Sequence, residues 1–154
     1  MKIYLVQHGE AKSEKEDPER PLTDKGKEEV ESVACYAAKC GIEVAEILHS
    51  GRLRAKQTAE LFAQYLSPSQ GVTEAKGLAP LDDPGKAQEL VQKAERSLMI
   101  VGHLPHLSRL ASLLVLDTAD KEIIKFTMGG GVCLDYSDNV WSIQWALTPK
   151  FIPK

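Results

Sequence analysis

Two histidines each come directly after a short apolar run and stand beside a glycine. Residues 3–6 lead into Gln7-His8-Gly9, and residues 98–101 lead into Gly102-His103. In an open α/β sheet, ligands bind in the crevice beyond the carboxyl ends of the strands, and a glycine lets the backbone approach a bound group closely. The pattern predicts that both imidazoles face one ligand crevice, although either histidine taken alone also fits a structural role.

A third polar junction carries a hydroxyl and a guanidinium. Ser50 follows an apolar run, and Arg54 stands at the start of a helical pattern. With His8 and His103, this junction would present two imidazoles, a guanidinium and the amides of helix N-termini. Helix N-termini donate oriented N–H groups to anions, and an arginine offers phosphate oxygens a planar fork. If the three junctions converge, the crevice suits a phosphoryl group.

Alternating helical and strand-like patterns would position these junctions. Thr23 is typical of a helix N-cap, and Gly41 ends the helix that follows. Hydrophobic periodicity predicts further helices at 53–66, 86–95 and 107–114. Strands are predicted at 3–6, 44–48, 71–75, 97–101, 132–136 and 140–147, the last two forming a hairpin. The fold class is therefore α/β: a three-layer α/β/α sandwich with a mostly parallel central sheet and a C-terminal antiparallel hairpin at one edge.

Trp141 and Trp145 lie four residues apart in the last predicted strand. This even spacing places both side chains on one face of a regular strand. Core packing or covering of the sheet is the favoured interpretation, and a peptide-docking surface is the alternative.

Composition is that of a soluble globular protein. The 154 residues are expected to form one domain, 1–154, with 27% charged and 43% hydrophobic residues. A net charge of -3 gives no general attraction for nucleic acid or anionic lipid, so neither is an expected partner. The N-terminal apolar run is too short for a signal peptide, and no run approaches the ~20 apolar residues that span a bilayer. With no heptad repeat or long apolar exposed face, we expect a cytoplasmic monomer.

Cys35, Cys40 and Cys133 form neither a CxxC pair nor an even set. Their number favours a reducing compartment, with the thiols acting as small buried hydrophobes. His103 and His106 are three residues apart, but the proline-containing turn between them and the absence of cysteine pairs argue against a zinc site. We expect neither a metal ion nor another cofactor.

Four motifs follow one another along the chain. They are His8-Gly9, Arg20-Pro21-Leu22-Thr23 with Gly26, Ser50 with Leu53-Arg54-Ala55-Lys56-Gln57-Thr58-Ala59, and Val101-Gly102-His103-Leu104-Pro105. In this order and at this spacing they resemble the histidine phosphatase superfamily. The short length without a large insertion is similar to the SixA-type phosphohistidine phosphatases of that superfamily. The resemblance runs from Met1 to about Leu147.

The resemblance implies roles for the matching positions. His8 would be the nucleophile and form a transient phosphohistidine, with the second nitrogen of its neutral ring donating to a carbonyl or similar acceptor. His103 would hydrogen-bond the phosphoryl group, and Arg54 would bind its oxygens. No metal is implied. The substrate-binding residues would be Gln7, Gly9, Arg20, Ser50, Arg52, Gly102 and, at the rim of the crevice, His106.

Gln7 departs from the Arg-His-Gly motif of the family. A neutral amide still donates an N–H but cannot neutralise charge. Because a charge-assisted hydrogen bond contributes roughly 1.5 to 3 kcal/mol, its loss could lower transition-state stabilisation about ten- to a hundred-fold. Substitute cations are available in the matching loops: Lys12, Arg20, Arg52 and Lys56. Arg52 shares the turn with Arg54, but Arg52 and Lys56 also fit solvated helix-start charges, and Arg20 also fits a residue that fixes its loop.

No carboxylate is assigned as the general acid, because Glu10, Asp17, Asp82 and Asp83 each also fit a surface turn. A phosphoramidate leaving group takes a proton from solvent more readily than an alkoxide, which favours a phosphohistidine substrate. The expected function is metal-independent removal of a phosphoryl group from a histidine-phosphorylated protein. A small phosphorylated molecule as substrate and a catalytically impaired phosphoryl-binding module are the alternatives.

Overall fold

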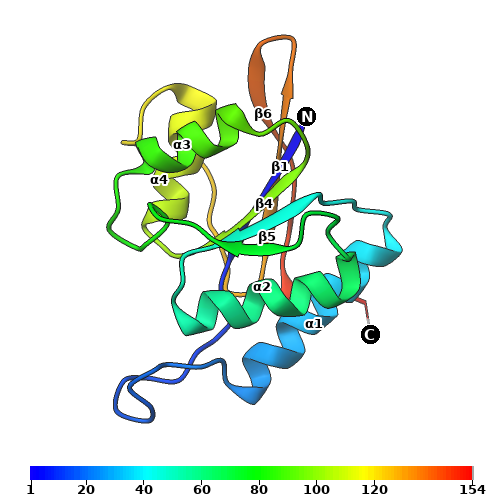
Figure 1. Cartoon of the computed structure of the whole chain (residues 1–154), viewed down its shortest axis with the longest axis vertical. Coiled ribbons are helices and arrows are strands. Elements are labelled where there is room, and N and C mark those ends of the chain that lie inside the picture. Colours follow the sequence, from blue (N-terminus) through cyan, green and yellow to red (C-terminus); the bar gives the residue numbers. More distant parts are fainter. Residues whose placement is uncertain (154) are drawn as a thin grey trace.

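A six-stranded mixed sheet forms the middle layer of the molecule (Figure 1). The computed structural model describes residues 1–153. The strands are β1 (Lys2–Gln7), β2 (Glu46–His49), β3 (Val72–Glu74), β4 (Leu98–Gly102), β5 (Gly131–Ser137) and β6 (Val140–Leu147), in the order β3-β2-β4-β1-β5-β6. The first four pair in parallel, whereas β5 is antiparallel to both β1 and β6. The predicted sandwich with an antiparallel hairpin at one edge is confirmed.

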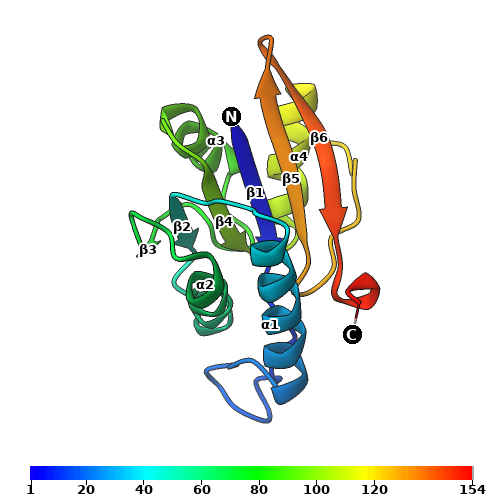
Figure 2. The same cartoon turned by 90° about the vertical axis from the view of Figure 1, so that its right-hand side faces the viewer.

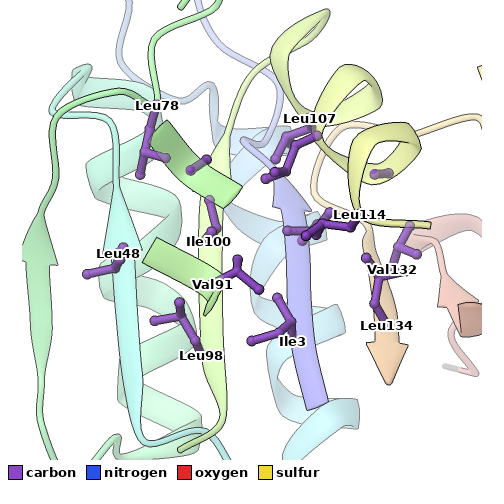
Figure 3. Packing of buried hydrophobic residues seen from close by; sticks show 14 residues of the cluster. Ile3, Leu48, Leu78, Val91, Leu98, Ile100, Leu107, Leu114, Val132 and Leu134 are labelled. Carbon is purple, nitrogen blue, oxygen red and sulfur yellow. The ribbon is translucent and has the colours of Figure 1, made fainter. Parts of the chain in front are cut away.

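Two pairs of helices cover the two faces of the sheet (Figure 2). They are α1 (Asp24–Lys39) with α2 (Leu53–Leu66), and α3 (Pro84–Lys93) with α4 (His106–Leu116); a short 3-10 helix, η1 (Pro149–Phe151), follows β6. Side chains of β1 alternate between the two layers: Leu5 and Ile3, the latter labelled in Figure 3, pack toward α3 and α4, and Tyr4 and Val6 pack toward α1 and α2. Both faces of this central strand are therefore buried, which explains its continuous apolar run.

Local capping sets where the helices begin. Thr23 accepts a hydrogen bond from the Gly26 N–H at 2.9 Å, as predicted for the N-cap of α1. Helix α2 has the predicted bounds. Helix α3 begins before residue 86, because Asp83 accepts a hydrogen bond from the Gly85 N–H at 2.8 Å and Pro84 occupies the first turn.

Trp141 and Trp145 face opposite layers, so the prediction that they share a face was wrong. The pairing register shifts between Cys133, which pairs with Trp145, and Leu134, which pairs with Ile143. This bulge inserts Gln144 and reverses the alternation of side chains. Trp141 packs against the cluster under α3 and α4, whereas Trp145 lies 5.9 Å from Tyr4, ring centroid to ring centroid, on the α1 side.

The cysteines do not all fill the core. Cys133 is buried in β5, but Cys35 is half-buried and Cys40 is exposed at the end of α1. All three are free thiols. None of the helices in residues 1–153 is long and apolar enough to cross a bilayer.

Candidate active site

His8 and His103 meet where β1 and β4 end side by side. Gln7 pairs with Gly102 in the sheet, and His8 and His103 are the residues that directly follow this pair. The His8 N–H donates to the Gly102 carbonyl at 3.0 Å, and the two imidazole centroids are 5.1 Å apart. His8 is 9% exposed and His103 only 2%. The predicted convergence of the two histidines is therefore present.

The imidazole of His8 is held in one orientation by its own backbone. Its Nδ1 lies 2.7 Å from the Gly9 carbonyl oxygen, so an Nδ1–H donates and Nε2 keeps its lone pair. Burial lowers the pKa of His8, and the charges of Arg54 and Arg20 lower it further against the opposing effect of the Gly9 carbonyl. His8 is therefore neutral at pH 7, with Nε2 free to act as a nucleophile.

Gly9 is required by packing rather than by approach to a ligand. A Cβ at this position would lie 2.7 Å from the Val30 side chain of α1. The Gly9 N–H donates to the Thr58 hydroxyl at 3.0 Å, and that hydroxyl donates to the Arg54 carbonyl at 2.8 Å. Thr58 is fully buried. Helix α2 thus holds the backbone just beyond His8.

The turn after β2 places Ser50 against His103. The Ser50 Oγ lies 2.6 Å from the His103 Nε2 and accepts a hydrogen bond from the Arg52 N–H at 3.3 Å. Burial, followed by the charges of His8, Arg54 and Arg52, lowers the pKa of His103 to about 3. The third predicted junction therefore also reaches the crevice.

Three guanidinium groups act on this pair of histidines. Burial lowers the pKa of Arg54, and the charges of Arg20 and Arg52 lower it further. Arg20 also lowers the pKa of His8, and Arg52 that of His103. The Arg54 Nε is buried and has no hydrogen-bond partner among residues 1–153. Among residues 1–153, no carboxylate contributes to the pKa shifts of His8, Arg54 and His103. The crevice is therefore strongly positive and suits an anion.

Arg20 fixes its loop, which is one of the two uses considered for it. Its Nε donates to the Lys12 carbonyl at 3.0 Å, which fixes the loop before α1. Its backbone has a left-handed φ of 50°. The charge of its guanidinium also lowers the pKa of His8 and that of Arg54.

Each of the four candidate general acids accepts a hydrogen bond that stabilises the loop or turn around it. Each carboxylate accepts a hydrogen bond from a neighbouring backbone N–H or hydroxyl: Glu10 from Thr23, Asp17 from Glu19, Asp82 from Ala79, and Asp83 from Gly85. Within residues 1–153, no group of three or more His, Cys, Asp or Glu residues could hold a metal ion.

Gln7 and His106 differ from what their sequence positions suggest. The Gln7 backbone bonds to Gly129 and Gly130, but its side-chain Oε1 is buried and has no partner among the described residues. The placement of His106 at the rim was wrong, because its side chain is fully buried at the first residue of α4. Burial lowers the pKa of His106 against the opposing effects of the Asp82 charge and the Gly77 backbone, and His106 in turn helps to lower the pKa of His103.

Comparisons with known proteins agree with this geometry. A family model of the histidine phosphatase superfamily (branch 1) matches residues 3–82. An uncharacterized protein of Picosynechococcus sp. (strain PCC 7002) is 36% identical over 119 residues, which cover 72% of this chain and 71% of that protein. The chain belongs to the histidine phosphatase superfamily.

Two further comparisons extend the likeness along almost the whole chain. Phosphohistidine phosphatase SixA of Escherichia coli (strain K12) is 29% identical over 157 residues, covering 97% of this chain and 94% of SixA. A solved structure of the protein histidine phosphatase SixA complexed with tungstate superimposes with a TM-score of 0.85 at 24% identity, covering 99% of this chain and 100% of the other. This chain and the solved SixA structure therefore share the histidine phosphatase fold.

In this member of the superfamily, the structure also uses residues to which the sequence assigned no role. Gln57 accepts a hydrogen bond from the Leu22 N–H at 2.8 Å, and Thr58 binds Gly9. Both lie in the motif that carries Arg54, so the motif itself was the signal, but their partners are distant in sequence. His49, directly before Ser50, was likewise left without a role.

Proposed function

We propose that this protein removes a phosphoryl group from a histidine-phosphorylated protein, through a covalent phosphohistidine on His8. The observation that carries the proposal is the buried His8–His103 pair among three guanidinium groups, with no carboxylate of residues 1–153 among the groups that shift the pKa values of the pair. The name of the E. coli relative, phosphohistidine phosphatase SixA, supports this choice of substrate.

The first step breaks the substrate's P–N bond. The His8 Nε2 lone pair attacks phosphorus in line with that bond, and the departing imidazole takes a proton from solvent. Arg54 and Arg20 bind the phosphoryl oxygens as charge shifts in the transition state, and His103 with Ser50 fixes a further oxygen. In the second step, water attacks phosphorus, the bond to His8 breaks, and inorganic phosphate leaves with His8 neutral again.

The three guanidinium groups offer a reason why Gln7 is compatible with turnover. Arg20 acts on His8 and Arg52 acts on His103, so positive charge reaches both sides of the pair without an arginine at position 7. We infer that these side chains supply much of the neutralisation that a motif arginine would give. Arg20 is the better placed of the two for the attacking nitrogen.

A single-turnover assay tests the proposal. Wild type, His8→Ala and the control Lys39→Ala are mixed with phosphoramidate or with a histidine-phosphorylated protein, and acid-labile phosphate on the protein is trapped. We expect label on wild type and on Lys39→Ala, since that lysine is exposed in the last turn of α1, and none on His8→Ala. Phosphate binding without label or turnover would replace the enzyme by a phosphoryl-binding module. Turnover of phosphomonoesters alone would indicate a small-molecule substrate.

A further inference from the structure

His49 is a buried histidine that the proposed reaction does not use. It is the last residue of β2 and only 5% exposed. Its Nδ1 accepts a hydrogen bond from the Gly51 N–H at 3.0 Å. An N–H donor pointing at Nδ1 requires this nitrogen to be unprotonated, so the ring is neutral with its proton on Nε2.

The turn that His49 holds is tightly confined. Gly51 has a left-handed φ of 91°, and a Cβ there would lie 2.7 Å from the Glu74 carboxylate. Glu74 in turn pairs with His49 in the β2–β3 register. The Gly51 amide is thus fixed between an imidazole and a neighbouring strand, in a backbone conformation that glycine alone adopts readily.

This turn carries the site residues that lie opposite His8. Ser50 precedes Gly51 and touches His103, and Arg52 follows it as the N-cap of α2, two residues before Arg54. Arg52 has no side-chain cap for the helix, so the bonds within the turn are what fix the helix start. A change of the Gly51 amide direction would move Ser50 away from His103.

We propose that His49 is a positioning residue whose neutral imidazole holds the Ser50-Gly51-Arg52 turn in the conformation that places Ser50 against His103. The inference rests on the proposed function for its kinetic consequence, but the turn itself is independent of it. A protonated His49 presents a second donor to the Gly51 N–H, so the bond is lost and the turn is released.

The charged groups around His49 come from two elements. Glu74 of β3 and Glu60 of α2 favour the protonated ring, whereas Lys56 of α2 and burial disfavour it. Burial is the largest effect, so the pKa of His49 lies below the usual value of 6.5. The turn is therefore held at neutral pH and released in acid.

Two substitutions separate the hydrogen bond from the bulk of the side chain. His49→Leu fills a similar volume without an acceptor. His49→Asn keeps an acceptor, because its carbonyl oxygen is bonded to Cγ as Nδ1 is, and it does not titrate. We expect kcat/KM for phosphoramidate at pH 7.5 to fall about ten-fold in the Leu variant, the effect of one lost hydrogen bond, and to return to within about three-fold of wild type in the Asn variant. Ile47→Val, a core truncation in the same strand, should lower Tm without lowering kcat/KM.

The acid limb of the pH profile gives a readout that a merely structural role would not move. In wild type, log kcat/KM should fall in acid with a slope of one proton from His8, with a further drop of about ten-fold as His49 is protonated, and this further drop should be absent in His49→Asn. Unchanged kcat/KM in His49→Leu overturns the proposal, as does equal loss in the Leu and Asn variants at equal Tm.

A second measurement covers the case in which wild type shows no turnover. Affinity for inorganic phosphate at pH 7.5 should then be several-fold weaker in His49→Leu and restored in His49→Asn, and nitrogen NMR should show His49 protonated on Nε2 alone. Equal phosphate affinity in all three proteins, or a proton on Nδ1, would contradict the positioning role whether or not the protein is an enzyme.

Discussion

Gln7 comes directly before the proposed nucleophile, and its side-chain oxygen is buried with no partner among residues 1–153. An arginine here would place a charged donor beside the transferred phosphoryl group. We expect Gln7→Arg to raise kcat/KM for phosphoramidate about ten-fold, the effect of one charge-assisted hydrogen bond. Gln7→Met is the matched control, because methionine has a similar length and no hydrogen-bond donor. Its kcat/KM should not exceed that of wild type. If Gln7→Arg folds normally and kcat/KM is unchanged, the guanidinium groups already present supply all the charge that the reaction uses.

Thr58 joins α2 to the backbone beyond His8 through a buried hydroxyl. Thr58→Val keeps the shape but leaves the Gly9 N–H without an acceptor, so we expect a loss of about 1–3 kcal/mol in the free energy of unfolding. We also expect a lower kcat, because the Gly9 carbonyl that orients His8 is no longer fixed. Urea denaturation and steady-state kinetics measure the two effects. Thr58→Ser retains the hydroxyl and should lose less stability; equal losses in both variants would show that the methyl group matters instead.

Residue types and order in the sequence were enough to predict that His8, His103 and the Ser50–Arg54 turn converge. They were not enough to place Arg20, whose effect on His8 depends on a left-handed backbone and on a bond to Lys12. The direction of His106 was also out of reach, since it depends on how α4 packs against the loop holding Asp82. Such side-chain directions follow from tertiary packing rather than from local pattern.

At the scale of elements, the start of α1 is pressed against the chain that leaves His8. A Cβ on Gly26 would lie 2.2 Å from the backbone oxygen of Glu10. This overlap can be relieved only if the backbone at Gly26 or at Glu10 moves. We expect Gly26→Ala to lower the free energy of unfolding by roughly 1–3 kcal/mol or more and to lower kcat by shifting His8. Lys27→Ala, exposed on the next position of α1, should change stability by less than about 0.5 kcal/mol. Urea denaturation of both variants measures the difference. Equal stability of Gly26→Ala and Lys27→Ala would contradict the close approach of Gly26 to Glu10.

Elements with strong local signals were predicted well, and those shaped by pairing were not. Helix α2 has its predicted bounds, because an apolar face and a following proline define it locally. The bulge opposite Cys133 and Leu134 leaves no comparable mark in the sequence, and it reverses the side on which Trp145 lies. One inserted residue is sufficient for this, since the side-chain period of a strand is two.

At the scale of the whole molecule, all four histidines are buried or nearly so, and each has a pKa below its ordinary value, chiefly because of burial. The folded protein therefore binds fewer protons than the unfolded chain at mildly acidic pH. By linkage, this stabilising contribution is complete above the unfolded pKa of about 6.5 and is lost as pH falls toward the folded values. The carboxylates of Glu16 and Asp135 titrate only at lower pH, where their own lowered pKa values apply.

We therefore expect the free energy of unfolding to fall between pH 7.5 and pH 5.5. His103 alone, with a folded pKa of about 3, should account for about 1.4 kcal/mol of that loss. Urea denaturation at pH 7.5, 6.5 and 5.5 measures it, and the fall from pH 7.5 to pH 5.5 should be smaller by about 1.4 kcal/mol in His103→Asn, which cannot titrate. Equal stability of wild type at the three pH values would mean that protons reach these imidazoles in the folded state. The crevice would then open to solvent far more than the 2% exposure of His103 indicates.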